Sequence, residues 1–130
     1  MRDSNMSVKI LLIDDETDYS ETVGFWLMAN GYQVRAVSSG IDGLKAIKDE
    51  VPDIVFLDFL MPGMDGIETL REIRKINTEL PVIMVSAYAA EEKMKEAEKM
   101  CISGIFLKEA ELSEVAKMIS ETLRNMKRGI

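Results

Sequence analysis

The chain has 130 residues, the size of one ordinary domain, and a formal net charge of −7, with no histidine and a single cysteine, Cys101. These counts exclude Ser-His-Asp and Cys-His catalysis, imidazole metal sites and an internal disulfide. The acidic balance without a basic run argues against direct nucleic-acid binding, and no apolar run approaches the roughly 20 residues that span a bilayer. We therefore expect a cytoplasmic domain that binds neither nucleic acid nor a membrane.

Taken in chain order, the apolar runs predict five short strands that alternate with helices. We expect residues 1–7 to be a flexible lead-in, residues 8–127 to form the domain, and residues 128–130 to be a tail. The expected strands cover about 8–13, 32–37, 54–58, 82–85 and 104–107. Helices are expected to begin near Glu16, after Gly40, after Asp65, near Glu91 and near Glu111. This alternation predicts a doubly wound α/β fold around a parallel sheet.

Capping residues and apolar spacing define the expected helices more closely. Asn30-Gly31 is typical of a helix end, Ser38-Ser39-Gly40 offers an N-cap, and Asp65 with Glu68 resembles a capping box. The helix predicted for about 91–100 places Met94, Ala97 and Cys101 on one side. The other predicted core-facing positions are Tyr19, Val23, Trp26 and Leu27, then Ile41, Leu44 and Ile47, then Ile67, Leu70, Ile73 and Ile76, and finally Leu112, Val115 and Ile119.

Acidic side chains follow two of the apolar runs. Asp14 and Asp15 come directly after the first expected strand, and Asp58 ends the third. A lone Asp58 is most simply a turn residue, but ligands of open α/β sheets bind at the carboxyl ends of strands. Three carboxylates in one crevice repel each other unless a cation neutralises them, and an all-oxygen pocket suits Mg²⁺. The pattern therefore predicts a magnesium site.

These acids belong to a larger ordered pattern. It comprises Asp14-Asp15, the turn from Asp58 to Gly66, Ser86 after the fourth strand and Lys108 after the fifth. The pattern resembles the receiver domain of two-component response regulators, in the CheY-like superfamily, over about residues 8–125. The resemblance implies a flavodoxin-like three-layer sandwich with five helices and strand order 2-1-3-4-5.

The resemblance also implies a role for each site residue. Asp58 would accept a phosphoryl group, while Ser86 and Lys108 would contact its oxygens. Mg²⁺ would be held by Asp14, Asp15, Asp58 and the backbone carbonyl of Leu60. The implied partners are a histidine kinase or phosphotransfer protein as donor, and an effector protein or an output domain outside this sequence as reader. A homodimer that forms on phosphorylation is also implied. On this interpretation the chain is a signalling domain and not a turnover enzyme.

Several positions depart from the family pattern. Receivers usually carry Gly-Ala at Cys101-Ile102, an aromatic switch residue at Ile105 and proline at Glu109. Leu60 and Tyr88 would flank the path by which water attacks an acyl phosphate, so we expect slow dephosphorylation. Two alternatives remain: a protein-binding module that works without phosphorylation, or an aspartyl-phosphate phosphatase. The phosphatase is disfavoured because Leu60 stands where such hydrolases carry a second acid.

Overall fold

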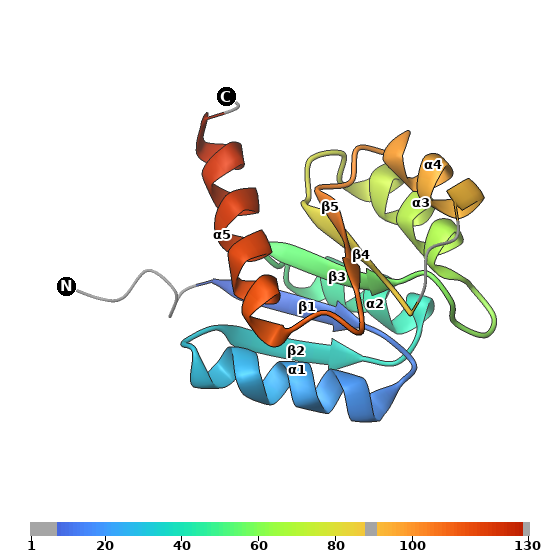
Figure 1. The fold of residues 1–130 in the computed structure, drawn as a ribbon. Helices are drawn as coiled ribbons and strands as arrows, with labels where there is room; N and C mark the ends of the chain where they lie inside the picture. The colour runs from blue at the N-terminus through green and yellow to red at the C-terminus, as the bar shows by residue number, and fades with distance from the viewer. Residues whose placement is uncertain (1–7, 88–90, 129–130) are drawn as a thin grey trace.

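The computed structural model describes residues 8–87 and 91–128, which form a parallel sheet between two layers of helices (Figure 1). The strands are β1 (Lys9–Ile13), β2 (Gln33–Val37), β3 (Ile54–Asp58), β4 (Val82–Ser86) and β5 (Gly104–Leu107). The helices are α1 (Thr17–Ala29), α2 (Gly40–Asp49), α3 (Gly66–Ile76), α4 (Glu91–Glu98) and α5 (Leu112–Arg128). None of the helices in the described ranges is long and apolar enough to cross a membrane.

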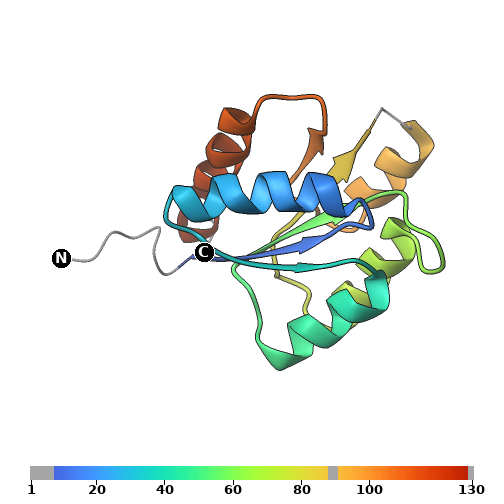
Figure 2. The ribbon, with the colours of Figure 1, turned by 90° about the horizontal axis from the view of Figure 1, so that it is seen from below.

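The strands lie in the order β2-β1-β3-β4-β5, and every neighbouring pair is parallel. This confirms the predicted doubly wound topology. Helices α1 and α5 cover one face of the sheet, while α2 and α3 cover the other (Figure 2). Each crossover helix buries its apolar stripe against the sheet, which is the arrangement that right-handed βαβ units require.

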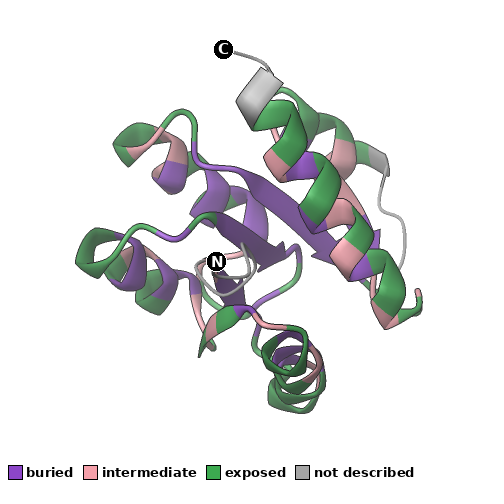
Figure 3. Ribbon diagram, turned by 90° about the vertical axis from the view of Figure 1, so that its left-hand side faces the viewer, coloured by how far each residue is buried: buried purple, intermediate pink, exposed green. Residues whose placement is uncertain are grey.

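The sheet separates two apolar clusters, and its central strands contribute to both. Every residue of β3 and β4 is buried, as expected for strands covered on both faces (Figure 3). One cluster packs Leu57 and Met84 against α2, α3 and α4, and the other packs Phe56 and Ile83 against α1 and α5. The buried centre fixes the strand register, and register determines which side chains meet at the carboxyl edge of the sheet.

The predicted helix caps are largely confirmed. The Ser39 hydroxyl accepts a hydrogen bond from the Asp42 N–H at 3.1 Å, and the Asp65 carboxylate accepts one from the Glu68 N–H at 2.9 Å. Gly31 follows α1 with φ of 92°, a left-handed conformation that glycine adopts without strain. The boundaries of α1, α2 and α3 therefore follow from local sequence.

The prediction for the buried face of α2 was wrong in part. Ile41 was expected to point inward, but it is 54% exposed, and the buried positions include Gly40, Gly43 and Ala46. A Cβ at position 43 would lie 2.4 Å from Cδ1 of Ile13. Gly43 therefore allows α2 to approach β1 closely, while a Cβ at position 40 would lie 2.2 Å from Oγ1 of Thr69 in α3. The helix packs through small residues on this face, which a search for large apolar side chains does not find.

The ends of α3 and α4 also differ from expectation. Cys101, predicted to share the buried side of α4, is exposed with φ of 58°, because α4 ends at Glu98 and a turn follows. Ile76, the last residue of α3, is 46% exposed. In both cases the predicted apolar face of the helix continues past the last residue that packs against the core.

Candidate functional site

Four polar residues lie at the carboxyl edge of the sheet. Asp14 follows β1, Asp58 ends β3, Ser86 ends β4 and Lys108 follows β5. Asp14, Asp58 and Ser86 are all buried. The backbone pairing continues to this edge, since the Lys108 N–H donates to the Ser86 carbonyl at 2.8 Å. The strand order therefore brings together residues that are distant in the sequence, as the sequence predicted.

The Lys108 ammonium forms ion pairs with three acidic side chains in this site. Its Nζ lies 2.9 Å from Oδ2 of Asp14 and 3.3 Å from Oδ2 of Asp58, and it also pairs with the Glu16 carboxylate. The ring centroid of Tyr19 lies 4.9 Å from the same nitrogen. Burial opposes the charge on Lys108, but hydrogen bonds to Glu16 and Asp14 outweigh it and raise the pKa of the ammonium. Lys108 is therefore a fixed cation at neutral pH.

The electrostatics of Asp58 differ from those of an ordinary aspartate. Burial and the neighbouring charge of Asp14 raise the pKa of Asp58 to about 6, although Lys108 opposes this. The Leu60 N–H donates to Oδ1 of Asp58 at 3.3 Å. The carboxylate is ionised at neutral pH, but its charge is held at a cost in free energy that a second cation would relieve.

The carboxylates are spaced for a divalent ion. One oxygen each from Asp14, Glu16 and Asp58 lie within 4.8 Å of one another. An all-oxygen set of this kind suits Mg²⁺, so the residues present fit the predicted ion. Asp15, which the sequence favoured, is exposed and does not belong to this group, whereas Glu16, which it missed, does. The Glu16 N–H also donates to Oδ1 of Asp14 at 2.8 Å.

The turn after β3 explains part of the motif. The Gly66 N–H donates to the Phe59 carbonyl at 3.0 Å, and a Cβ on Gly66 would lie 2.2 Å from the carbonyl oxygen of Asp58. Gly63 has φ of 75°. Gly66 allows α3 to begin directly against the Asp58 peptide, and Gly63 allows the chain to reverse direction in the turn. Both glycines therefore serve the placement of Asp58.

The departures from the family pattern lie around β5. Ile105 is partly buried and packs against the cluster on the α2, α3 and α4 side of the sheet, and Glu109 is exposed. Tyr88, which the sequence analysis placed beside the water path, lies outside the described residues. Leu60 is 48% exposed. Strand β5 therefore packs an aliphatic side chain at the position where receivers usually carry an aromatic ring.

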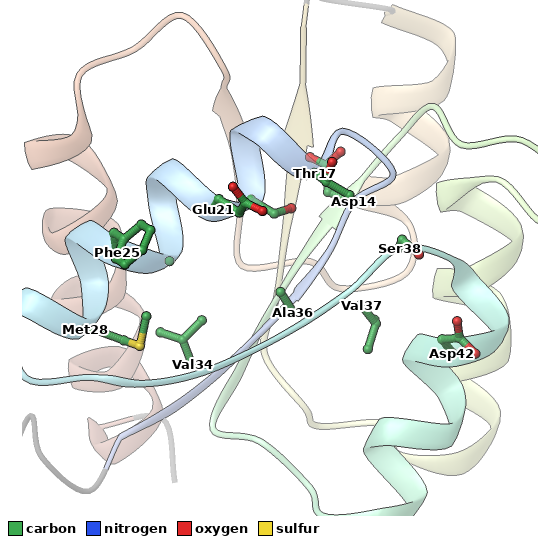
Figure 4. Close-up of a pocket in the computed structure, with 12 residues that line it drawn as sticks. Asp14, Thr17, Glu21, Phe25, Met28, Val34, Ala36, Val37, Ser38 and Asp42 are labelled. Carbon is green, nitrogen blue, oxygen red and sulfur yellow. The ribbon is translucent and has the colours of Figure 1, made fainter.

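A groove of about 570 Å³ lies between α1 and β2, beside this edge of the sheet (Figure 4). It meets the acidic site at Asp14, and the side chains of Phe25, Met28 and Val34 line its other end. Asp58 and Lys108 are not among its lining residues. The groove is therefore a neighbour of the acidic site and not part of it.

Comparison with known proteins identifies the family. The family model described as "response regulator receiver domain" matches residues 10–120. The chain is 32% identical to the transcriptional regulatory protein ZraR of Klebsiella oxytoca over 120 residues, which is 92% of this chain but 27% of that protein. The chain thus spans about a quarter of the length of this curated relative.

Solved structures agree with this assignment. The receiver domain of NtrX from Brucella abortus is 31% identical, with a TM-score of 0.83, over 88% of this chain and 98% of that one. A response regulator receiver domain protein from Clostridium thermocellum is 27% identical, with a TM-score of 0.87, over 95% of this chain and 99% of that one. With the motifs, the strand order and the acidic edge all in the family's arrangement, the chain belongs to the receiver domains of response regulators, which act in two-component signalling.

Proposed function

We propose that Asp58 is the phosphoacceptor of this receiver domain, and that a histidine kinase or a phosphotransfer protein is its donor. The observation that supports this most directly is the contact between the buried Asp58 carboxylate and the ammonium of Lys108, with Asp14 beside them. Such a site combines a nucleophilic oxygen with positive charge for the incoming phosphoryl group. The domain extends over residues 8–127 in this proposal.

In the proposed reaction, an oxygen of Asp58 attacks the phosphorus of the donor, and a P–O bond forms as the donor's P–N bond breaks. The leaving imidazole nitrogen keeps the electron pair and takes a proton. Lys108 neutralises a phosphoryl oxygen, and the Ser86 hydroxyl donates a hydrogen bond to another. Bound Mg²⁺ would supply further positive charge to these oxygens. Its proposed ligands are Asp14, Asp15, Asp58 and the Leu60 carbonyl, while Glu16 pairs with Lys108.

The remaining steps concern how the phosphorylated domain passes the signal on. We propose that phosphorylation changes the surface read by an effector protein or by an output domain, and that a phosphorylation-dependent homodimer is one form of that output. Because the donors are kinases that signal to the cell interior, we place the domain in the cytoplasm. The chain needs no turnover activity in this role, since it gains and loses its own phosphoryl group.

The test is chemical phosphorylation of the chain. Incubation with phosphoramidate and Mg²⁺ should raise the intact mass by one phosphoryl group, and hydroxylamine should remove it, as expected for an acyl phosphate. Asp58→Asn should block the uptake. Asp53→Asn is a matched control, because Asp53 lies near the other end of β3, where its carboxylate accepts a hydrogen bond from the Lys9 N–H at 2.7 Å. Uptake that persists in the Asp58 variant at equal stoichiometry would identify another acceptor and overturn the proposal.

A further inference from the structure

Glu16 occupies a position where its side chain is unexpected. It is the N-cap residue of α1, with φ of −83° and ψ of 91°, yet its carboxylate makes no capping hydrogen bond to the described N–H groups of that helix. Asp, Asn and Ser are the residues that cap well, because their short side chains reach the first N–H groups of the helix. The longer Glu16 side chain extends instead to Nζ of Lys108, at the far side of the sheet edge.

The main chain and the side chain of Glu16 therefore act on different residues. Its N–H donates to Oδ1 of Asp14 at 2.8 Å, which orients that carboxylate. Its carboxylate pairs with Lys108, which the Tyr19 ring also contacts from α1. Of the three acids on the ammonium, Asp14 and Asp58 have side chains that are 6% and 5% exposed, while that of Glu16 is 60% exposed.

We propose that Glu16 is a positioning residue that holds Lys108 toward α1 in the unphosphorylated domain and competes with the phosphoryl group for this ammonium. The inference rests on the proposed function, since it concerns the same phosphorylation site. A phosphoryl group on Asp58 presents new anionic oxygens to Lys108, and contact with them requires the ammonium to change partners. The Glu16 contact is the one that breaks at least cost, because water can solvate an exposed carboxylate but not the buried one of Asp14.

The competition sets the expected direction of mutational effects. Without the Glu16 contact, Lys108 is available to the phosphoryl oxygens without first giving up a partner. An ion pair with one exposed member corresponds to about a two- to fivefold change in an equilibrium constant. Beryllofluoride, which mimics the phosphoryl group on an aspartate, should therefore bind variants that lack this contact about two- to fivefold more tightly at saturating Mg²⁺.

Two substitutions separate the contact from the charge. Glu16→Gln removes the charge together with the contact. Glu16→Asp keeps the charge, but the shorter side chain suits the N-cap position, so its carboxylate should turn to the N–H groups of α1 and leave Lys108. Glu21→Gln is the matched control, since Glu21 is an exposed acid on the same helix. Both Glu16 variants should bind beryllofluoride more tightly than wild type, and the Glu21 variant should match wild type.

The experiment is a beryllofluoride titration of the four proteins by ¹⁹F NMR, with the Mg²⁺ affinity of each measured by calorimetry. A repeat in the Lys108→Gln background should abolish the differences, because the contact no longer exists there. Tighter binding by Glu16→Gln alone would mean that charge and not contact matters, which overturns the inference. So would a change of more than about threefold in the Mg²⁺ affinity of Glu16→Asp, which would make Glu16 a cation ligand. A wild-type chain that binds no beryllofluoride would instead refute the proposed phosphorylation site and the inference with it.

Discussion

The charge on Asp58 should destabilise the folded domain in the absence of a divalent cation, so Asp58→Asn should be more stable than wild type. The pKa of Asp58 rises from 3.8 to about 6 on folding, because of burial and the charge of Asp14. Each pKa unit corresponds to about 1.4 kcal/mol, which gives a cost of about 3 kcal/mol for keeping the group ionised. Asparagine preserves the shape without the charge, so the variant should recover about 2–3 kcal/mol of unfolding free energy near pH 7.5.

The pH dependence gives this prediction its sharpest form. Below about pH 4 the carboxyl is protonated in both the folded and unfolded states, so wild type and Asp58→Asn should be equally stable. Between about pH 4 and 6 only the unfolded chain loses the proton, so wild type falls progressively behind, and above about pH 6 the difference is constant. Urea unfolding followed by circular dichroism in EDTA measures it, with Glu79→Gln as the exposed control. A difference that is absent at pH 7.5, or equally large at pH 4, would refute the electrostatic argument.

Three further changes test the packing and the lifetime of the site. Gly43→Ala should lower the unfolding free energy by about 1–3 kcal/mol, because the added Cβ would meet Ile13 at 2.4 Å. Gly24→Ala should raise the unfolding free energy by up to about 1 kcal/mol, because its Cβ would meet Val34 no closer than 3.7 Å. Urea unfolding compares the two variants with wild type. Arg74→Met should cost about 2–3 kcal/mol in the same assay, since the guanidinium donates to four backbone carbonyls across the ends of α3 and α4, and Arg74→Lys should recover only part of it. Leu60→Asn should shorten the half-life of the phosphorylated chain, measured by intact mass after donor removal, because an amide can orient a water that the leucine excludes; an unchanged half-life would contradict this.

The strands and the acidic edge were predicted well because each depends on a local signal, whereas the strand order was predicted from the family resemblance. An apolar run that ends at Asp58, or a serine before Gly40, is visible within a few residues. Contacts between distant elements were not visible in this way. The pairing of Glu16 with Lys108 spans 92 positions, and nothing near Glu16 distinguishes it from Asp15. Glu16 therefore could not be identified as a site residue from the sequence alone.

The buried face of α2 and the role of Arg74 were missed for a related reason. A helix that packs through Gly40 and Gly43 has a weak apolar pattern, so periodicity favoured the exposed Ile41. Arg74 follows the polar pattern of a solvated helix face, yet its Nη1 donates to the Leu80 carbonyl at 2.7 Å and its Nε to the Met100 carbonyl at 2.8 Å. Whether a long cationic side chain faces water or backbone depends on the three-dimensional path of other segments.

Lys108 directly follows strand β5, which is the shortest strand and an edge of the sheet. Edge strands with few buried residues open locally at lower free energy than the centre of a fold, and only Phe106 is fully buried in β5. When β5 detaches, Lys108 departs with it, and Asp14 and Asp58 remain on the still-folded strands without their shared ammonium. The repulsion between them then opposes the opening, so the acids at one end of the sheet act as a restraint against fraying of its edge. Neutralisation of either acid should accelerate amide hydrogen exchange along β5 even where it stabilises the domain as a whole.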